Sequence, residues 1–476
     1  MIFSSYPFLL FFAATMALVL LQGRMLRHSA RRLPVLRWIL IAASLFFYAL
    51  GDVRNLPVLL AAALVNYGLA LLIRRARGPR PRRAAWLTGA GVALDIALLA
   101  LFKFGGLLPG FTWAFPLGIS FFTFQLIWYL LDCGRGELKY GGFGDFLLSV
   151  TFFPKLLMGP LTRHDELISQ FHEGNGTGVQ PGNLLRGLFV FSVGLAKKTL
   201  LATPLLAFAG RAFADVTAAP PLELWLALPC NLLAIYFDFS GYADMAVGLG
   251  LALGFRLPES FDSPLKARNV QEFWRRWNIT VTRFLNDNIF ARIYRRGAKA
   301  PVFCLGVLVT FLVSGLWHGS GHSPGVIGNF LLWGLLHGAA ICVQTLASLR
   351  ASRRFLMPLV PARLLTTAFL VLTAALFSCR DLGQFGALFG ALGNWRYYTG
   401  PVRTGAAGEL LLFLAQNIYP VALAVLGGAA AFFAPNTARL SKKCLDDWRY
   451  PVGAAMLAAL SLVSMKGVSG FVYLAF

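Results

Sequence analysis

Charged residues are scarce in this sequence, and acidic residues are the scarcest of them. Only 13% of its 476 residues are charged, with 20 acidic residues against 43 basic ones. Apolar residues make up 57% of the chain, and the mean hydropathy is +0.66. Soluble globular domains carry about 25% charged residues, so this composition excludes that class. The sequence therefore predicts an integral membrane protein.

The sequence also lacks paired cysteines and any hydrophilic segment long enough to form a separate soluble domain. Its six cysteines are scattered within or beside apolar runs, at spacings that suit neither a metal site nor a disulfide framework. The first apolar run lacks the basic region that precedes the core of a signal peptide, so we interpret it as a retained membrane helix. We expect the functional site to lie in or beside the bilayer.

Apolar runs of about 20 residues, the length that crosses a bilayer, recur from Tyr6 to the C-terminal end. We count roughly eleven to thirteen such runs by this criterion. They predict an all-α, polytopic membrane protein. We divide it into N-terminal membrane helices (1–104), a central core (105–345) and C-terminal membrane helices (346–476), all within one continuous membrane domain.

Basic residues are clustered in alternate short loops. A formal charge of +23 would suggest nucleic-acid binding in a soluble domain, but here the clusters follow the positive-inside rule of membrane proteins. We therefore predict that the basic loops are cytoplasmic, that the N-terminus lies on the outer side, and that nucleic acid is not a partner. The first two clusters comprise Arg24, Arg27, Arg31 and Arg32, and Arg74, Arg75, Arg77, Arg80, Arg82 and Arg83.

The middle of the chain is interrupted by proline, glycine and charge, most clearly at 115–122, 152–155 and 159–164. Non-helical backbone at membrane depth survives only where protein or a water-filled cavity satisfies its polar groups. The interruptions therefore indicate either re-entrant segments around a cavity or loops at the membrane interface.

Two carboxylates, Asp238 and Asp244, lie in an otherwise apolar run. A charged aspartate at the centre of a bilayer costs about 2.5 to 3.5 kcal/mol on insertion scales, so each is expected to have a partner. The downstream cations Arg275 and Arg276 are obvious candidates. Six residues is not a same-face helical spacing, so the two aspartates do not form an acid and base pair. A structural ion pair and a role for Asp238 in a substrate tunnel both remain open.

The segment from 266 to 280 is too charged to span a membrane, and its aromatic and basic residues favour a helix at the interface or in the protein interior. Trp274 and Trp277, together with Trp317, are candidates either for lining a tunnel or for anchoring at the interface. Arg275 and Arg276 are candidates for binding donor phosphates or for pairing with the aspartates.

Three of the six histidines lie close together in apolar sequence, at His318, His322 and His337. Imidazole can accept and return a proton near neutral pH, so proton transfer within the membrane is the first hypothesis. A buried histidine that only forms hydrogen bonds is the alternative. His318 and His322 do not suggest a metal site, because Ser323-Pro324 disfavours a continuing helix and no acidic third ligand is near.

Several segments in the expected order resemble the membrane-bound O-acyltransferase family, and within it the bacterial polysaccharide acetyltransferases. The resemblance covers residues 115–340, with weaker matches at 376–380 and 472–476, whereas the first hundred residues match in hydropathy alone. The segments that carry it are 116–125 (PLGISFFTFQ), the Phe-Pro at 153–154, the Gly-Pro at 159–160, 236–244, 254–259, 272–277 (EFWRRW) and 314–338, which contains Trp-His-Gly at 317–319.

The resemblance implies a helical fold with a central tunnel, in which an acyl group from a cytoplasmic thioester meets an acceptor reached from the other side. It assigns the principal catalytic role to His318. Many bacterial members carry a second histidine after Arg-Arg-Trp, where this chain has Asn278. A mechanism with two imidazoles would then require His337. Asn278 could instead stabilise an oxyanion or orient the acceptor.

The resemblance further implies transfer of an acetyl group to an exported or cell-envelope polysaccharide, directly or through a periplasmic esterase-like partner, in the bacterial inner membrane. Acetyl-coenzyme A or another thioester would be the donor substrate, with membrane lipids around the protein and no tightly bound cofactor or metal. Two alternatives remain open. One is D-alanyl or fatty-acyl transfer to an envelope acceptor, and the other is an acyl or lipid transporter that forms no final ester.

Overall fold

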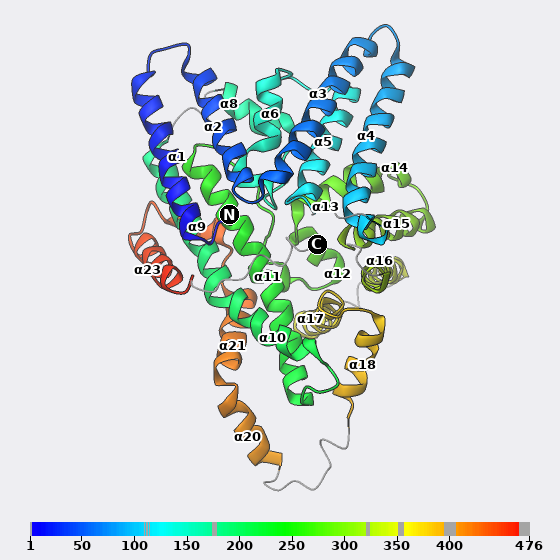
Figure 1. The fold of residues 1–476 in the computed structure, drawn as a ribbon. Coiled ribbons are helices and arrows are strands. Elements are labelled where there is room, and N and C mark those ends of the chain that lie inside the picture. The colour runs from blue at the N-terminus through cyan, green and yellow to red at the C-terminus, as the bar shows by residue number, and fades with distance from the viewer. Residues whose placement is uncertain are drawn as a thin grey trace. The chain divides into compact units, whose positions relative to one another are not determined.

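The computed structural model describes residues 2–108, 110, 113, 115–173, 179–319, 324–350, 357–394 and 406–465. Most of these residues are helical, and no strand occurs among them (Figure 1). Eight helical stretches in this part of the chain are long and apolar enough to cross a membrane. The all-α polytopic class is thereby confirmed. The stretches contain α1 (Tyr6–Met25), α2 (Arg32–Ala49), α3 (Leu56–Arg77), α4 (Pro81–Phe104), α9 (Pro181–Ala196) with α10 (Thr203–Ala214), α11 (Pro221–Ala252), α15 (Ala300–His318) and α16 (Pro324–Arg350).

The described residues also contain apolar helices that are bent or shorter than a full span. A ninth span arises if α20 (Ala406–Gln416) and α21 (Ile418–Phe433), which meet at an angle of 82°, are counted as one. Three further apolar helices in this part of the chain have 10–17 residues. They are α17 (Leu359–Ala375), α18 (Leu382–Leu392) and α23 (Arg449–Val463).

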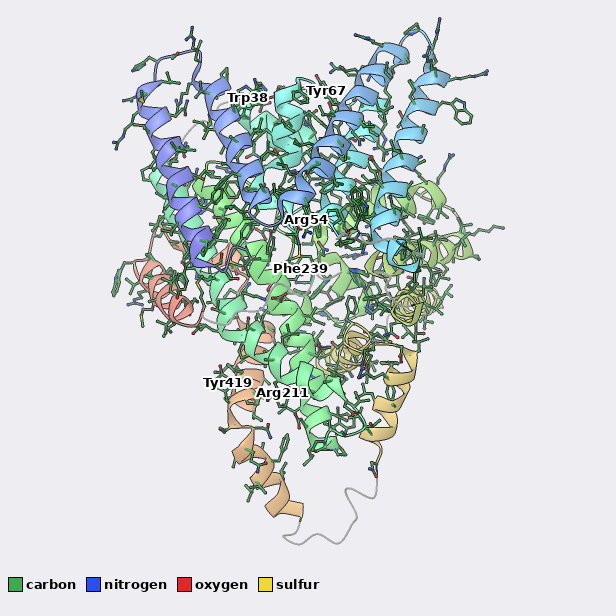
Figure 2. All side chains as sticks on the ribbon, in the orientation of Figure 1. Trp38, Arg54, Tyr67, Arg211, Phe239 and Tyr419 are labelled. Atoms are coloured by element: carbon green, nitrogen blue, oxygen red, sulfur yellow. The ribbon has the colours of Figure 1, made fainter. Side chains whose placement is uncertain are left out.

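Large apolar side chains cover the outward faces of these helices, as lipid contact requires. Figure 2 labels Trp38 of α2 and Tyr419 of α21, which are 48% and 62% exposed, whereas Phe239 of α11 is only 2% exposed. A soluble protein would bury such residues or hide them in an interface. The pattern agrees with the composition, because the surface and not only the interior is apolar.

The chain folds into two compact units. The first contains Met1–Ala196, Gly241–Ser260 and Thr437–Ala475, and the second contains Lys197–Ser240, Phe261–Asn436 and Phe476. The remaining helices of the first unit are short, and they include much of the interrupted middle of the chain. These are α5 (Ile119–Arg135), α6 (Phe143–Thr151), α7 (Phe153–Leu156), α8 (His164–His172) and α22 (Thr437–Lys443).

The interrupted segments of the first unit are packed inside protein and are not exposed interfacial loops. Every residue from 151 to 162 is buried, although the helix is broken twice there. The Lys155 side chain is fully buried, and its amine donates to Gln125 Oε1 at 2.7 Å and Thr162 Oγ1 at 2.8 Å. This lysine therefore joins α5, α7 and the loop before α8.

Glycine is required just before α5. Gly118 has a φ of +72°, and a Cβ on it would lie 2.9 Å from the carbonyl oxygen of Leu156. Both the left-handed backbone and the close approach exclude larger residues. The Pro-Leu-Gly sequence at 116–118 thus places the start of α5 directly against the end of α7.

The second unit contains α10, the first part of α11 and the chain from α12 to α21. Its shorter helices are α12 (Val270–Arg276), α13 (Ile279–Leu285) and α14 (Ala291–Ile293), and two segments form π-helical turns, Lys197–Ala202 and Asn286–Phe290. Such turns are rare in proteins, and they are frequent at functional sites. All nine residues predicted to form the catalytic and substrate-binding site belong to this unit.

Candidate active site

The two helices that carry the histidines pack against each other through glycine. A Cβ on Gly315 of α15 would lie 2.3 Å from the carbonyl oxygen of Phe330, and one on Gly334 of α16 would lie 2.4 Å from that of Phe311. A side chain at Gly315 or Gly334 would therefore force the backbone of the facing helix to move. Close approach of backbones through small residues is how helices associate in membranes, where no hydrophobic driving force acts between them.

We expect Gly315→Ala to destabilise the protein by about 1–3 kcal/mol, because the added methyl group forces α15 and α16 apart. The unfolding midpoint of purified protein in detergent measures this loss. Gly386→Ala in α18 is the matched control, since a Cβ there meets no atom within 4 Å. An exposed helical glycine gains stability from alanine, so the control should unfold at the same or a higher temperature. Equal midpoints for native protein and Gly315→Ala would contradict the packing argument.

His318 is the last residue of α15, and aromatic rings surround its imidazole. It is 7% exposed. The ring centroid of Trp317 lies 4.4 Å from that of His318, with Trp333 at 5.3 Å, Phe377 at 5.4 Å and Phe330 at 6.0 Å. These are contact distances for aromatic pairs. We call Trp317, Phe330, Trp333 and Phe377 the aromatic cage, and its rings shield the imidazole from lipid and bulk water.

His337 lies behind this cage, with both ring nitrogens engaged. Trp274 Nε1 donates to His337 Nδ1 at 3.1 Å, and His337 Nε2 lies 3.1 Å from Thr373 Oγ1. The Thr373 hydroxyl donates to the carbonyl oxygen of Phe369, so it accepts from His337 Nε2. The ring is therefore neutral, with its proton on Nε2. In this arrangement His337 orients Trp274 and Trp333, whose ring is 4.8 Å away, and presents no open nitrogen.

Asn278 occupies a strained position between α12 and α13. Its φ of 42° and ψ of 52° are left-handed, and among the described residues only Ser263 is another non-glycine residue with positive φ. Asparagine tolerates this conformation better than most residues. The side chain is 6% exposed, yet its amide makes no hydrogen bond to any residue that the structure describes.

The two arginines of α12 do not pair with the intramembrane aspartates, which corrects one of our expectations. Arg276 contacts Glu272 at 2.8 Å and Asp262 at 3.7 Å. Burial alone would raise the pKa of Glu272, but hydrogen bonds from the Arg268 N–H and the Arg276 side chain outweigh it and lower the pKa below its ordinary value. The Glu272 side chain that contacts Arg276 is therefore ionised at neutral pH. Arg275 is exposed and has no ion pair with a described residue.

Asp238 is paired with a lysine that precedes it in the chain. Lys198 Nζ lies 2.6 Å from Asp238 Oδ1, and the two side chains are 0% and 1% exposed. Asp244 accepts a hydrogen bond from the Thr437 hydroxyl at 2.7 Å. The aspartates therefore have partners as expected, but not the downstream arginines. The ion pair gives Asp238 a structural role within the second unit.

The three tryptophans proposed for a tunnel belong to one series of ring contacts, because Phe273 lies 5.4 Å from Trp274 and 5.3 Å from Trp277. Trp317 belongs to the aromatic cage, and Trp274 contacts Trp333 with centroids 5.5 Å apart. Trp277 packs among Phe261, Phe273 and Tyr236, at 5.1 Å, 5.3 Å and 6.1 Å. The structure thus brings Trp274, Trp317, His318 and His337 into one aromatic region. His322 lies outside the described residues.

The sequence matches the pattern of a known protein family. The pattern of the membrane-bound O-acyltransferase family matches residues 111–379, more than half of the sequence. The chain belongs to the membrane-bound O-acyltransferase family. It is therefore an O-acyltransferase, and the matched region contains every residue predicted for the site.

The chain is similar to several bacterial proteins that are named as acetyl- or alanyl-transferring enzymes. The chain is 35% identical to the peptidoglycan O-acetyltransferase of Helicobacter pylori, over 72% of this chain and 71% of that protein. It is 30% identical to the probable alginate O-acetylase AlgI of Azotobacter vinelandii, over 98% of this chain and 93% of that protein. The teichoic acid D-alanyltransferase of Bacillus subtilis is 24% identical, over 46% of this chain and 56% of that protein.

Sequence reasoning missed three members of the aromatic cage of this acyltransferase. Phe330, Trp333 and His337 occupy positions i, i+3 and i+7 of α16, so a helical-face analysis starting from His337 would have found the first two. Phe377 lies in the segment 376–380, which we recognised only as a weak family match. Its contact with His318 depends on the path of the chain after α17, which no local pattern encodes.

The described residues of this acyltransferase contain no group of three or more histidine, cysteine, aspartate or glutamate side chains that could hold a metal ion. His318, with its aromatic surroundings, is the candidate for proton transfer at this site.

Proposed function

We propose that this acyltransferase moves an acetyl group from a cytoplasmic thioester to hydroxyl groups of an exported or cell-envelope polysaccharide. The observation that carries the proposal is the position of His318, a buried imidazole at the end of α15 inside the aromatic cage. The names of the relatives support the acetyl group and the polysaccharide acceptor, since peptidoglycan and alginate O-acetylating proteins match most of the chain.

The chemistry needs one group that accepts and returns a proton. His318 removes the proton from an acceptor hydroxyl as its oxygen attacks the thioester carbonyl. The tetrahedral intermediate collapses when the carbon–sulfur bond breaks, and the proton passes from His318 to the leaving thiolate. The products are an ester and a free thiol, so atoms and charge balance without a cofactor. The amide of Asn278 supplies a hydrogen-bond donor for the developing oxyanion.

The donor in this proposal is acetyl-coenzyme A or another acetyl thioester, bound as a substrate. The basic clusters 24–32 and 74–83 support a cytoplasmic position for their loops and an outer position for the N-terminus in the inner membrane. A periplasmic esterase-like partner would receive the acetyl group wherever the chain does not form the final ester itself.

D-alanyl transfer is the second candidate. The teichoic acid D-alanyltransferases of Bacillus subtilis and Streptococcus thermophilus match the chain over 46% and 48% of its length. The acetylating relatives match 72% or more. The acetyl reading is therefore preferred, and fatty-acyl transfer or acyl transport without ester formation is the least supported.

The test uses purified full-length protein in nanodiscs with radiolabelled acetyl-coenzyme A. Peptidoglycan fragments and alginate oligosaccharides are supplied separately as acceptors, with D-alanyl thioester as the competing donor. We expect label to enter one of the polysaccharides, with one thiol released per ester formed. Folded protein that releases thiol only from the D-alanyl donor would replace the acetyl proposal by the second candidate.

Substitutions at Asn278 test its role as a hydrogen-bond donor. Asn278→Asp keeps the size of the side chain and tolerates the left-handed backbone, but it removes the N–H donor, so we expect kcat to fall about 10²–10³-fold. Asn278→His retains a ring N–H and also tolerates positive φ, so its kcat should remain well above that of Asn278→Asp. Steady-state kinetics with saturating donor distinguishes them. Equal kcat values for native protein and Asn278→Asp would remove Asn278 from the mechanism.

A further inference from the structure

The aromatic cage bears on which acyl groups the enzyme accepts, a question that the transfer chemistry leaves open. We infer that Phe377 is a specificity-determining residue that limits the transferred acyl group to acetyl, and that Asn231 and Asn329 hold it in place. This inference rests on the proposed acyl transfer at His318. It adds a substrate-size limit that neither the chemistry of His318 nor the family assignment supplies.

The rings of Phe377, Phe330 and Trp333 pack closely against the His318 imidazole. Phe377 lies edge-on to His318 at 5.4 Å, and it also contacts Phe330 at 4.9 Å and Trp333 at 5.4 Å. Phe330 and Trp333 in turn lie 6.0 Å and 5.3 Å from the imidazole. Centroid distances of this size mean van der Waals contact between rings. An acyl chain longer than two carbons that approaches His318 from the side of Phe377 must therefore displace this ring.

Phe377 is the cage member whose backbone is held by hydrogen bonds from two buried asparagines, Asn329 and Asn231, which we call the clamp. It follows α17 in a turn, whereas Trp317, Phe330 and Trp333 are held on helices α15 and α16. Asn329 Nδ2 donates to the carbonyl oxygens of Cys379 at 2.8 Å and Leu376 at 3.4 Å, on either side of Phe377. These bonds prevent the turn from moving away from α16.

A second asparagine completes the clamp. Asn231 Nδ2 donates to the carbonyl oxygen of Ala374 at 3.1 Å, and the Ser378 hydroxyl donates to Asn231 Oδ1 at 2.7 Å. Asn231 and Asn329 are 1% and 0% exposed. Buried amides of this kind are retained only when they form hydrogen bonds, and here most of those bonds hold the backbone that carries Phe377. The clamp is thus built to fix one aromatic ring against the catalytic imidazole.

The experiment compares acyl-coenzyme A donors of two, four and eight carbons with the same acceptor, using full-length protein in nanodiscs and release of free thiol as the readout. We expect native protein to use acetyl-coenzyme A and to discriminate strongly against the longer donors. Phe377→Ala should raise the ratio of kcat/KM for butyryl over acetyl by at least about tenfold, the discrimination typical of one or two methylenes in an apolar site. Phe377→Leu should give an intermediate ratio.

A gain on a longer donor cannot come from partial unfolding, which lowers the rate with every donor. Phe389→Ala is the matched control, because this phenylalanine of α18 is 45% exposed and lies outside the cage. Its butyryl to acetyl ratio should equal that of native protein. Phe377→Leu keeps most of the apolar volume, so it provides the test if Phe377→Ala does not fold.

Asn329→Leu tests the clamp itself. As a positioning residue, Asn329 acts through Phe377, so its loss should raise the butyryl to acetyl ratio, by less than Phe377→Ala does. A merely structural asparagine would lower all rates and leave the ratio unchanged, which would overturn its positioning role.

The size limit and the underlying chemistry fail in different ways. Octanoyl transfer by native protein at the acetyl rate, or an unchanged ratio in both folded Phe377 variants, would overturn the size limit while leaving acyl transfer intact. Absence of thiol release from every donor in native protein would instead refute the proposed function, and the size limit with it.

Discussion

Replacing His318 with alanine is expected to lower acyl transfer about 10²–10⁴-fold, the range that a positioned general base contributes. No described residue can substitute for it. His337 has both ring nitrogens engaged by Trp274 and Thr373, and the amide of Asn278 cannot accept a proton at neutral pH. The measurement is ester formation from radiolabelled acetyl-coenzyme A by purified protein in nanodiscs.

Two companion variants separate chemistry from folding. His318→Gln keeps a side chain of similar size within the aromatic cage but cannot act as a base, so it should lose transfer as completely as the alanine variant. His28→Ala changes an exposed histidine in the first unit and should retain full activity. If folded His318→Gln still transferred acetyl at a tenth of the native rate or faster, the general-base role of His318 would be refuted.

Removing Lys198 is expected to destabilise the protein by about 3–5 kcal/mol, the usual cost of leaving a buried charge without its partner. The Lys198→Met variant keeps the apolar length of the side chain but leaves Asp238, which is only 1% exposed, without its cation. Asp238→Leu should be destabilised for the reciprocal reason. The stability of both variants is measured as the unfolding midpoint in detergent. Unfolding is monitored as the loss of the folded-protein peak on size exclusion.

The double variant Lys198→Met/Asp238→Leu is the decisive comparison. Two apolar side chains can replace a buried ion pair at little cost, so the double variant should recover most of the stability lost in either single variant. An exposed pair provides the control: Arg54 lies 2.9 Å from Asp52 with its side chain 79% exposed, and Arg54→Met should leave the midpoint unchanged. Additive losses in the double variant would show that Lys198 and Asp238 act independently.

Composition and local pattern were sufficient for the fold class, and they single out His318 as the predicted central residue of the site. Apolar runs predicted a polytopic helical protein, and a histidine in the Trp-His-Gly of 317–319 was recognisable because few histidines occur in such apolar sequence. Hydropathy alone does not show that α20 and α21 meet at 82° or that α17, α18 and α23 are short.

Partnerships between distant segments could not be predicted from the sequence. Asp238 was expected to pair with a downstream arginine, but its cation is Lys198, at the start of a π-helical turn, whose geometry sequence patterns do not reveal. Likewise, the apolar setting of His337 did not show that Trp274 and Thr373 occupy its nitrogens. In both cases tertiary packing selects one partner among several that the chemistry allows.

The glycine contact between α15 and α16 has a consequence for biogenesis. These two helices are neighbours in the chain, so they can associate as soon as both have been inserted, and local pairings of this kind form early. The pair alone brings His318 together with Trp317, Phe330 and Trp333. Phe377 arrives only after α17 has been synthesised. Until the segment that carries Phe377 has been inserted, His318 therefore lacks its contact with that ring.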